Sequence, residues 1–279
     1  MLWRTLKLET DVSKLPLQIK EIKKIGTQDP LVSYIIYQNF KILECTTLTP
    51  EEKQEVEHEI WACSDNLQAM RLYYDKYLTS EKEYNWKEKA KWVGNVFQIE
   101  ELADFDLNLK EFLIWGVISV RNLFLLLEYA SGKKVNNIKE MDVVLNSFPP
   151  VARPYQVWQG FNVLITKLFL LRNRVEHKRL EVRGVEIHKV SQQEVTCVMP
   201  RIIIDQEEQV LIAEFMGYVF PNVADFCESM FAALFETKLP PYITIAYIPE
   251  NQQNPDIPMR FHVVPTFPIP KEKTDKQDQ

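Results

Sequence analysis

The chain has 279 residues, of which 46% are hydrophobic and 26% are charged, and its formal net charge is −6. A chain of this length and composition can bury a substantial core in one domain, or in one large and one small domain. The acidic balance argues against general electrostatic attraction to nucleic acid, because that mode of binding needs a basic surface; nucleic-acid chemistry would need a local basic patch.

Glycine and cysteine usage narrows the class of protein further. Only 7 glycines stand against 15 phenylalanines, 11 tyrosines and 6 tryptophans, a balance that favours packed helices over a glycine-rich phosphate-binding fold. The cysteines are far apart, without a Cys-x-x-Cys pair or a histidine at ligand spacing, so we expect no zinc site, no disulfide framework and no cofactor. The first residues lack the apolar core of a signal peptide, which predicts a cytoplasmic protein.

Residues 1–104 are predicted to form an N-terminal helical region. Leu31–Leu43 has the apolar density of a buried helix. Thr49–Glu52 combines a capping hydroxyl, a proline and a glutamate three residues on, so a helix should begin there and run to about Tyr77. Trp86–Leu102 is predicted to be an amphipathic helix of mixed charge.

The next region, residues 105–238, is predicted to be a helical bundle. Asp106 can cap its most hydrophobic helix, which includes Phe112–Ala130 and stops at Ser131–Gly132. This stretch is also the best transmembrane candidate, but Arg121 lies near its middle, where a charge is costly in lipid, so we expect a central bundle helix and no membrane contact.

Three further helices complete the predicted bundle. They are a short helix over Asn137–Asn146, a long one from Tyr155 to about Arg179, and a last one over Ile203–Lys238 that is bent at Pro221.

Two β hairpins accompany the helices. The first, over residues 181–204, is inserted in the bundle, and the second, over residues 239–264, packs on it. The two hairpins could also pair with each other as one small sheet. Residues 265–279 are rich in proline and charge and are predicted to be a disordered tail. The fold class is therefore mainly α, a helical bundle with an N-terminal helical extension and two short β hairpins.

The most informative motif is Arg172-Asn173-Arg174-Val175-Glu176-His177, at the end of the helix that begins near Tyr155. An arginine and an imidazole five residues apart can act together on a phosphodiester. On an ideal helix the two side chains point about 140° apart, so they converge only if the helix frays or if a second subunit contributes its own pair. The motif therefore predicts a homodimer.

An arginine, a polar residue directly after it and a histidine after four intervening positions, on a helical protein, resemble the signature of the HEPN superfamily. The resemblance covers this hexapeptide and a helical setting over Leu107–Lys238. It implies a HEPN-like bundle and a metal-independent endoribonuclease whose substrate is RNA. It further implies a prokaryotic toxin or phage-defence effector, held in check by a cognate inhibitor or antitoxin protein.

The resemblance also implies roles for three residues of the motif. Cleavage would proceed by attack of the RNA 2′-hydroxyl on the adjacent phosphorus, leaving a 2′,3′-cyclic phosphate. His177 would move a proton on or off the reacting oxygens, and Arg172 would place a fixed charge where the phosphorane gathers negative charge. Asn173 would orient either group, whereas Glu176 could pair with Arg172 or Arg179 and blunt the site.

Residues around the motif are candidates for substrate binding. Arg174, Lys178 and Arg179 supply a local basic patch, although the same charges also suit the last turn of a helix, whose dipole they complement. Arg121 and Asn122 form a second candidate, because an arginine buried in an apolar helix needs a partner such as Glu128, Glu176 or a bound phosphate.

Two other interpretations stay open. Arg172 and His177 can simply solvate a helix end, and a HEPN-like bundle can serve as a non-catalytic module that binds a nucleotide or a partner protein. The chain also holds a second arginine and histidine at the same spacing, Arg183 and His188. That pair lies in an alternating apolar pattern typical of a strand, with glycine in the polar position, and we interpret it as coincidental.

Overall fold

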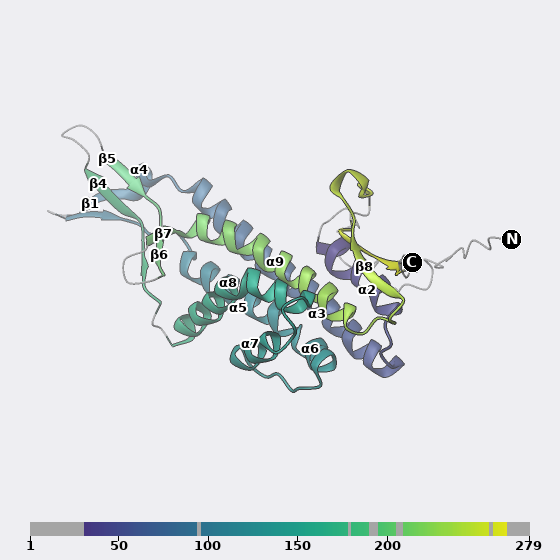
Figure 1. Ribbon diagram of the computed structural model, residues 1–279. Helices are drawn as coiled ribbons and strands as arrows, with labels where there is room; N and C mark the ends of the chain where they lie inside the picture. The colour runs from purple at the N-terminus through teal and green to yellow at the C-terminus, as the bar shows by residue number, and fades with distance from the viewer. Residues whose placement is uncertain are drawn as a thin grey trace, which may run out of the picture.

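The computed structural model describes residues 31–93, 96–177, 180–189, 195–204, 209–256 and 259–266. Helices dominate this part of the chain, as predicted (Figure 1). Long helices run along the molecule; one group of short strands lies at one end, and another pair of strands lies at the other (Figure 1).

The N-terminal region begins with a π-helical segment, η2 (Val32–Tyr37), which continues into α2 (Gln38–Glu44). The predicted helix over Leu31–Leu43 is therefore confirmed, with a wider first half than an α-helix. The next helix, α3 (Pro50–Glu83), begins where predicted and ends later. Its capping box is complete, because the Thr49 hydroxyl accepts the Glu52 N–H at 3.2 Å while the Glu52 carboxylate accepts the Thr49 N–H at 2.8 Å.

The helix predicted over Trp86–Leu102 is wrong. This segment forms one helical turn, α4 (Trp86–Lys89), followed by the antiparallel strands β1 (Ala90–Val93) and β2 (Val96–Ile99). The physical reason is visible in the sequence, where a Gly-Asn pair separates two runs rich in aromatic and β-branched residues. That local hairpin signal outweighs the weak helical periodicity.

The most hydrophobic stretch of the chain forms two helices, α5 (Phe105–Arg121) and α6 (Phe124–Ser131). The cap of α5 is Asp104, in the left-handed region at φ 55°, rather than the predicted Asp106, which lies in the first turn. The end of α6 is as predicted, since Gly132 takes a left-handed conformation at φ 69°.

In the described part of the chain, the segment from α5 to the end of α6 is the one long and apolar enough to cross a membrane, by length and composition alone. Half of its most apolar window is buried inside the protein, as in the core helix of a soluble protein. The break between α5 and α6 also interrupts it.

The bundle is completed by α7 (Ile138–Asn146), α8 (Arg153–Glu176) and α9 (Ile212–Glu236). Helix α5 packs against α3 and α8, and α9 packs against α3, α5 and α8. Pro221 lies inside α9, which starts nine residues later than the predicted start at Ile203, because two strands precede it.

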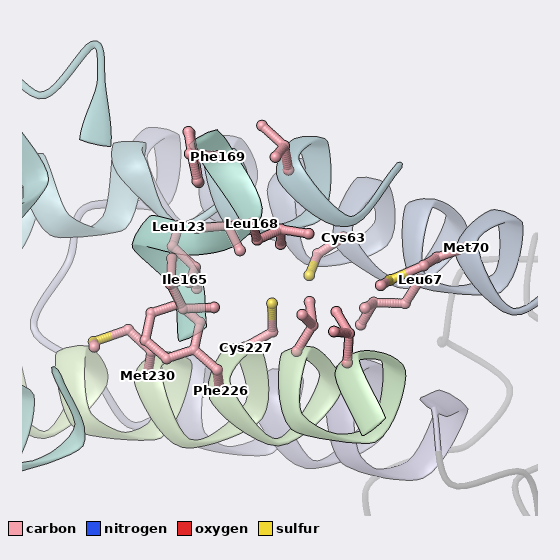
Figure 2. Packing of buried hydrophobic residues seen from close by; sticks show 14 of the residues in the cluster. Cys63, Leu67, Met70, Leu123, Ile165, Leu168, Phe169, Phe226, Cys227 and Met230 are labelled. Atoms are coloured by element: carbon pink, nitrogen blue, oxygen red, sulfur yellow. The ribbon is translucent and has the colours of Figure 1, made fainter. Parts of the chain in front are cut away.

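One continuous apolar core joins these helices, and Figure 2 shows side chains from α3, α8 and α9 meeting in it. Each large side chain removed from water contributes about 1.5–3 kcal/mol. The largest fully buried side chains include Trp158, Tyr77, Phe112, Phe226, Phe231 and Phe235. Since α3 shares this core with α9, the N-terminal helices and the bundle are packed as one body.

Within the described residues, the strands form four small antiparallel sheets. The predicted hairpin over residues 181–204 is present as β3 (Val182–Arg183), β4 (Glu186–Lys189), β5 (Val195–Val198) and β6 (Arg201–Ile203). It gains a strand, because β6 pairs with both β3 and β7 (Gln209–Leu211), while β4 pairs with β5.

The second predicted hairpin is also present, as β8 (Ile243–Tyr247) and β9 (Phe261–Pro265), with the 3-10 turn η3 (Glu250–Gln252) between them. This hairpin does not pair with the first hairpin, so the prediction that the two hairpins could form one small sheet is wrong. The two hairpins lie at opposite ends of the molecule (Figure 1). Of the predicted tail, residues 267–279 lie outside the described residues.

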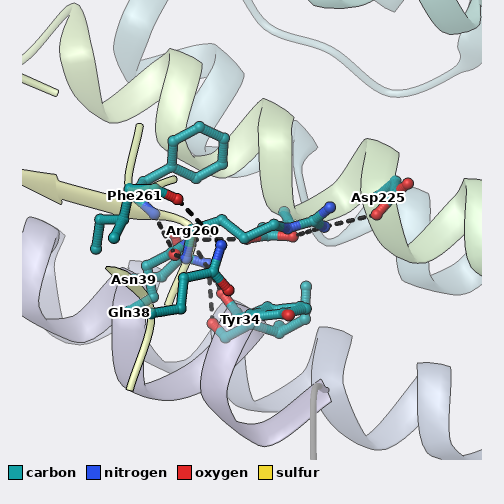
Figure 3. A network of polar contacts seen from close by, with 10 residues as sticks. Tyr34, Gln38, Asn39, Asp225, Arg260 and Phe261 are labelled. Carbon is teal, nitrogen blue, oxygen red and sulfur yellow. Dashed lines mark hydrogen bonds and ion pairs between the residues drawn. The ribbon is translucent and has the colours of Figure 1, made fainter. Parts of the chain in front are cut away.

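An ionic network holds the β8–β9 hairpin on the helices (Figure 3). The Arg260 guanidinium donates to the carboxylates of Glu228 and, at 2.6 Å, of Asp225. The guanidinium also lies 4.6 Å from the centre of the Tyr34 ring. Glu228 is fully buried in α9, so this arginine supplies the positive charge that its carboxylate needs.

Gln38, also fully buried, completes the network. Its side-chain oxygen accepts the backbone N–H groups of Arg260 at 2.7 Å and Phe261 at 2.8 Å, and its amide nitrogen donates to Glu228 at 3.1 Å. The C-terminal hairpin is thus joined to the N-terminal helix by a side chain whose donor and acceptor are both used.

Candidate functional site

The predicted catalytic motif lies at the C-terminal end of α8. Helix α8 is anchored in the core by side chains such as Trp158, Ile165 and Leu168, and His177 is its C-cap residue. The His177 backbone N–H donates to the Asn173 carbonyl at 3.1 Å, while both side chains are exposed. The end of α8 therefore presents an imidazole and an amide to solvent on a helix whose other face is fixed.

Arg172 occupies a different position from its neighbours. Its side chain is only 18% exposed and forms an ion pair with the Glu176 carboxylate, one turn later. Its Nη1 also donates to the Asn173 side-chain oxygen at 3.3 Å. Its Nε is buried and has no hydrogen-bond partner. The guanidinium is therefore held against the bundle, with one carboxylate as its anionic partner in the described chain.

The structure does not bring Arg172 and His177 together. Among the described residues, no hydrogen bond or ion pair joins their side chains, as their separation around the helix predicts. Asn173 lies between them in sequence, and its side-chain oxygen accepts a hydrogen bond from Arg172. A reaction that uses both groups on one phosphate would need a second copy of the chain or a change at the helix end.

Arg174 has a structural role, because its Nη1 donates to the Ile204 carbonyl at 2.6 Å. This bond joins α8 to the segment that follows β6. Lys178 and Arg179, the other predicted members of the basic patch, lie outside the described residues.

The prediction that Arg121 is buried, and so needs Glu128, Glu176 or a bound phosphate as its partner, is wrong about the burial. Arg121 is exposed at the last residue of α5, because the apolar stretch breaks there instead of continuing as one helix. Its guanidinium lies 5.9 Å from the centre of the Phe169 ring. Since Phe169 precedes Arg172 by one turn of α8, Arg121 lies on the same side of that helix as Arg172.

Asn122, which was predicted together with Arg121 as a second candidate for substrate binding, forms two side-chain hydrogen bonds in the structure. It accepts from the Asn66 side chain at 2.8 Å and donates to the Glu59 carboxylate at 2.7 Å. These bonds satisfy the polar groups where α5 ends against α3. Asn122 therefore positions the end of α5, and Arg121 alone of this pair faces solvent.

The second pair at the same spacing lies in strands, as predicted. Arg183 is in β3 and His188 is in β4. Both approach the Glu186 carboxylate, His188 at 3.2 Å and Arg183 at 3.9 Å, and Arg201 forms an ion pair with the same group. This cluster joins neighbouring strands and has the ordinary character of a sheet ion-pair network.

A cavity of about 370 Å³ lies between α8 and α9, beside the motif. Its wall on α8 includes Leu168 and Leu171, the latter directly before Arg172. Lys167, Glu214 and Tyr218 are its polar members; the rest of the lining is aliphatic or aromatic. Such a surface suits an apolar group rather than a phosphate, so an anionic substrate would bind outside this cavity, at the helix end.

Two buried cysteines show how burial suppresses reactivity. Cys63 and Cys227 are free thiols on α3 and α9, and their sulfur atoms lie near each other in the core (Figure 2). Burial, followed by the hydrogen bond with Cys227, raises the pKa of the Cys63 thiol well above its usual range. A thiol in that state is a poor nucleophile. In the described ranges, no three His, Cys, Asp or Glu side chains gather as a metal site.

Sequence reasoning missed a polar cluster where α3 faces the start of α9. The Tyr77 hydroxyl and one Glu81 carboxylate oxygen are buried without a hydrogen-bond partner. Burial, followed by the negative charge of Glu214, raises the pKa of Glu81, and burial with Glu81 nearby also raises the pKa of Tyr77. The pairing of Glu81 with Glu214 joins residues far apart in the chain, so no local pattern could have predicted it.

A comparison of the chain with protein-family models, curated proteins and solved structures finds no match.

Proposed function

We propose that this protein is a metal-independent endoribonuclease of the HEPN type that acts as a homodimer in the cytoplasm. The observation that carries the proposal is the position of the motif: an exposed imidazole and a half-buried guanidinium share the end of one core helix. The local chemistry supports it too, because a histidine changes charge near neutral pH and an arginine keeps its charge.

In the proposed reaction the RNA 2′-hydroxyl attacks the adjacent phosphorus and the 5′-oxygen leaves, giving a 2′,3′-cyclic phosphate. His177 transfers a proton to or from these oxygens, and Arg172 stabilises the charge on the phosphorane. Asn173 orients the guanidinium that it contacts. We propose that Arg121, together with Arg174, Lys178 and Arg179, holds neighbouring phosphates of the strand.

The exposed face of α8 supports a dimer that includes the motif. Val163 is 68% exposed and Leu170 is 46% exposed, so two aliphatic side chains of this helix face solvent. Together with His177 they recur every seven residues and so share one side of the helix. Gly160 lies beside this row with open space around it. A second copy docked here would cover the apolar row and bring its own motif residues toward His177.

The experiment is incubation of the purified protein with mixed RNA in EDTA, with analysis of the fragment ends. We expect cyclic-phosphate ends, and a loss of rate of about 10²–10⁴-fold in His177→Ala. The matched control is His188→Ala, which removes an exposed histidine of the same spacing in the strands. Equal rates for wild type and both variants would refute the assignment of His177.

A mixing experiment tests the composite site. If each site takes Arg172 from one copy and His177 from the other, a mixture of Arg172→Ala and His177→Ala chains restores one site in each heterodimer. Since about half of the dimers are then heterodimers, about a quarter of the wild-type rate returns. Two inactive variants that stay inactive when mixed and exchanged would contradict an arginine–histidine pair shared in this way.

On the basis of the resemblance to the HEPN superfamily, we also propose that the protein is a prokaryotic toxin or phage-defence effector that a cognate inhibitor holds inactive. The second candidate function is a non-catalytic interaction or regulatory subunit that binds a nucleotide or a partner protein with the same bundle. The ion pair between Arg172 and Glu176 favours it, because that pair compensates the charge the reaction would use. RNA left intact in EDTA and with added divalent metal would select this candidate.

A further inference from the structure

We infer that Glu176 is a built-in competitor of the substrate: its carboxylate occupies the anion position of Arg172 and must be displaced before a phosphate can bind there. The inference concerns the regulation of the proposed nuclease site and rests on that function for its biological meaning. The carboxylate and the phosphate are alternative partners for the same guanidinium.

The first argument is the state of Arg172. The Arg172 side chain is 18% exposed and its Nε is buried, so the cation is partly removed from water and an anion close by stabilises it. Glu176 is that anion in the described chain, and the Asn173 oxygen adds one hydrogen bond at 3.3 Å. If the Glu176 charge is removed, the half-buried cation keeps only this neutral acceptor. Its demand for an external anion then increases.

The second argument is access. Arg172 directs Nη1 toward Glu176, and its Nε edge is buried and unpaired. A phosphate oxygen that binds Nη1 would therefore compete with the Glu176 carboxylate for the same donor. Glu176 is 39% exposed, so its side chain can turn into solvent when a phosphate arrives. Both residues are on one helix, and this exchange requires only a side-chain rotation.

The third argument is the contrast with Arg121. This arginine lies on the same side of α8 and has no carboxylate partner in the described chain, where its guanidinium lies over the Phe169 ring. An anionic strand could therefore meet Arg121 first and displace Glu176 from Arg172 afterwards. A ligand with little negative charge would not displace Glu176, so the ion pair between Arg172 and Glu176 would exclude such ligands from this position.

The test measures binding separately from cleavage. The probes are inorganic phosphate and a single-stranded 2′-deoxy oligonucleotide, which lacks the attacking hydroxyl and cannot be cleaved by the proposed route. Glu176→Gln keeps the size of the side chain and removes its charge. Glu181→Gln is the control, because Glu181 is exposed, nearby in sequence and changes the net charge equally.

We expect Glu176→Gln to bind the oligonucleotide roughly five- to tenfold more tightly than wild type. The variant lacks the carboxylate that competes with the phosphate for Arg172, and it lacks the negative charge that would repel a phosphate bound next to it. The Glu181→Gln variant should change binding less than twofold. Adding Arg172→Ala to Glu176→Gln should remove the gain. In an RNA cleavage assay Glu176→Gln should lower KM more than it changes kcat.

The outcomes separate the two proposals. Cleavage by wild type with equal affinities for Glu176→Gln and Glu181→Gln would overturn the competitor and leave the nuclease standing. No cleavage by any variant, with a gain in phosphate or oligonucleotide affinity that depends on Arg172, would overturn the nuclease and support Glu176 as the occupant of an anion site. No cleavage and no gain would overturn both.

Discussion

The ion pair between Arg260 and Glu228 gives a prediction whose magnitude follows from burial. The side chain of Glu228 is 1% exposed and that of Arg260 is 25% exposed. Replacing Arg260 by methionine keeps much of the apolar stem and leaves the carboxylate in the core without its cation. Removing one partner of a buried pair costs about 3–5 kcal/mol, and we expect the lower part of this range because solvent reaches the arginine.

The assay is equilibrium unfolding in urea at pH 7, followed by helical circular dichroism. In a separate thermal unfolding experiment, the same loss of about 3 kcal/mol should lower the Tm by roughly 6–12 °C for a chain of this size. The double variant Arg260→Met with Glu228→Gln should recover most of the loss, because the amide is neutral and keeps its hydrogen bond with Gln38. An equal denaturant slope in all variants would show that stability alone has changed.

Asp225→Asn is the matched control, since Asp225 binds the same guanidinium but is 47% exposed. This substitution should cost no more than about 1 kcal/mol. The reasoning would be refuted if Arg260→Met cost as little as Asp225→Asn, or if adding Glu228→Gln did not restore stability. Either result would mean that the Glu228 carboxylate finds water or another donor when Arg260 is gone.

Two further predictions concern α3. Burial and the charge of Glu214 raise the pKa of Glu81, so the folded state disfavours the charged form of this carboxyl group. The contribution of Glu81 to the free energy of unfolding therefore falls as the pH rises from the ordinary pKa of a glutamate through the raised pKa of the folded state. Glu81→Gln should therefore be more stable than wild type at pH 7, with the difference vanishing below about pH 4 in urea titrations; a difference independent of pH would contradict this. Thr49→Ala should lose about 1 kcal/mol by thermal denaturation, because it removes the acceptor for the Glu52 N–H; Thr49→Ser, which keeps the acceptor, should lose much less.

The features predicted correctly from sequence are those with local causes. The start of α3 follows from a capping hydroxyl and a glutamate three residues on, and the end of α6 follows from Gly132. The strand assignment of His188 follows from the alternation of apolar and polar residues. Each of these signals lies within one turn or one strand of the feature that it predicts.

The errors have longer-range or competing causes. The break after Arg121 carries no proline or glycine, so the sequence predicted one helix and placed that arginine in its interior. The network around Glu228 depends on a residue far along the chain and was missed. A signal was present, however: Glu228 follows Phe226 and Cys227 in an apolar helix, and an acid on a buried face requires a cation. The partner, Arg260, could not have been chosen from the sequence.

The geometry of α8 also separates what its motif residues do for the fold from what they do for the proposed reaction. Arg172 is held against the bundle and paired, whereas His177 is an exposed C-cap residue with no side-chain partner in the described chain. Truncating Arg172 should therefore lower both stability and any activity, because Glu176 loses its partner and the core edge loses a packed side chain. Truncating His177 should leave the unfolding curve unchanged, so a loss of activity in that variant would report chemistry alone. If both substitutions lowered stability equally, the helix end would be a structural cap, and its histidine would carry no argument for catalysis.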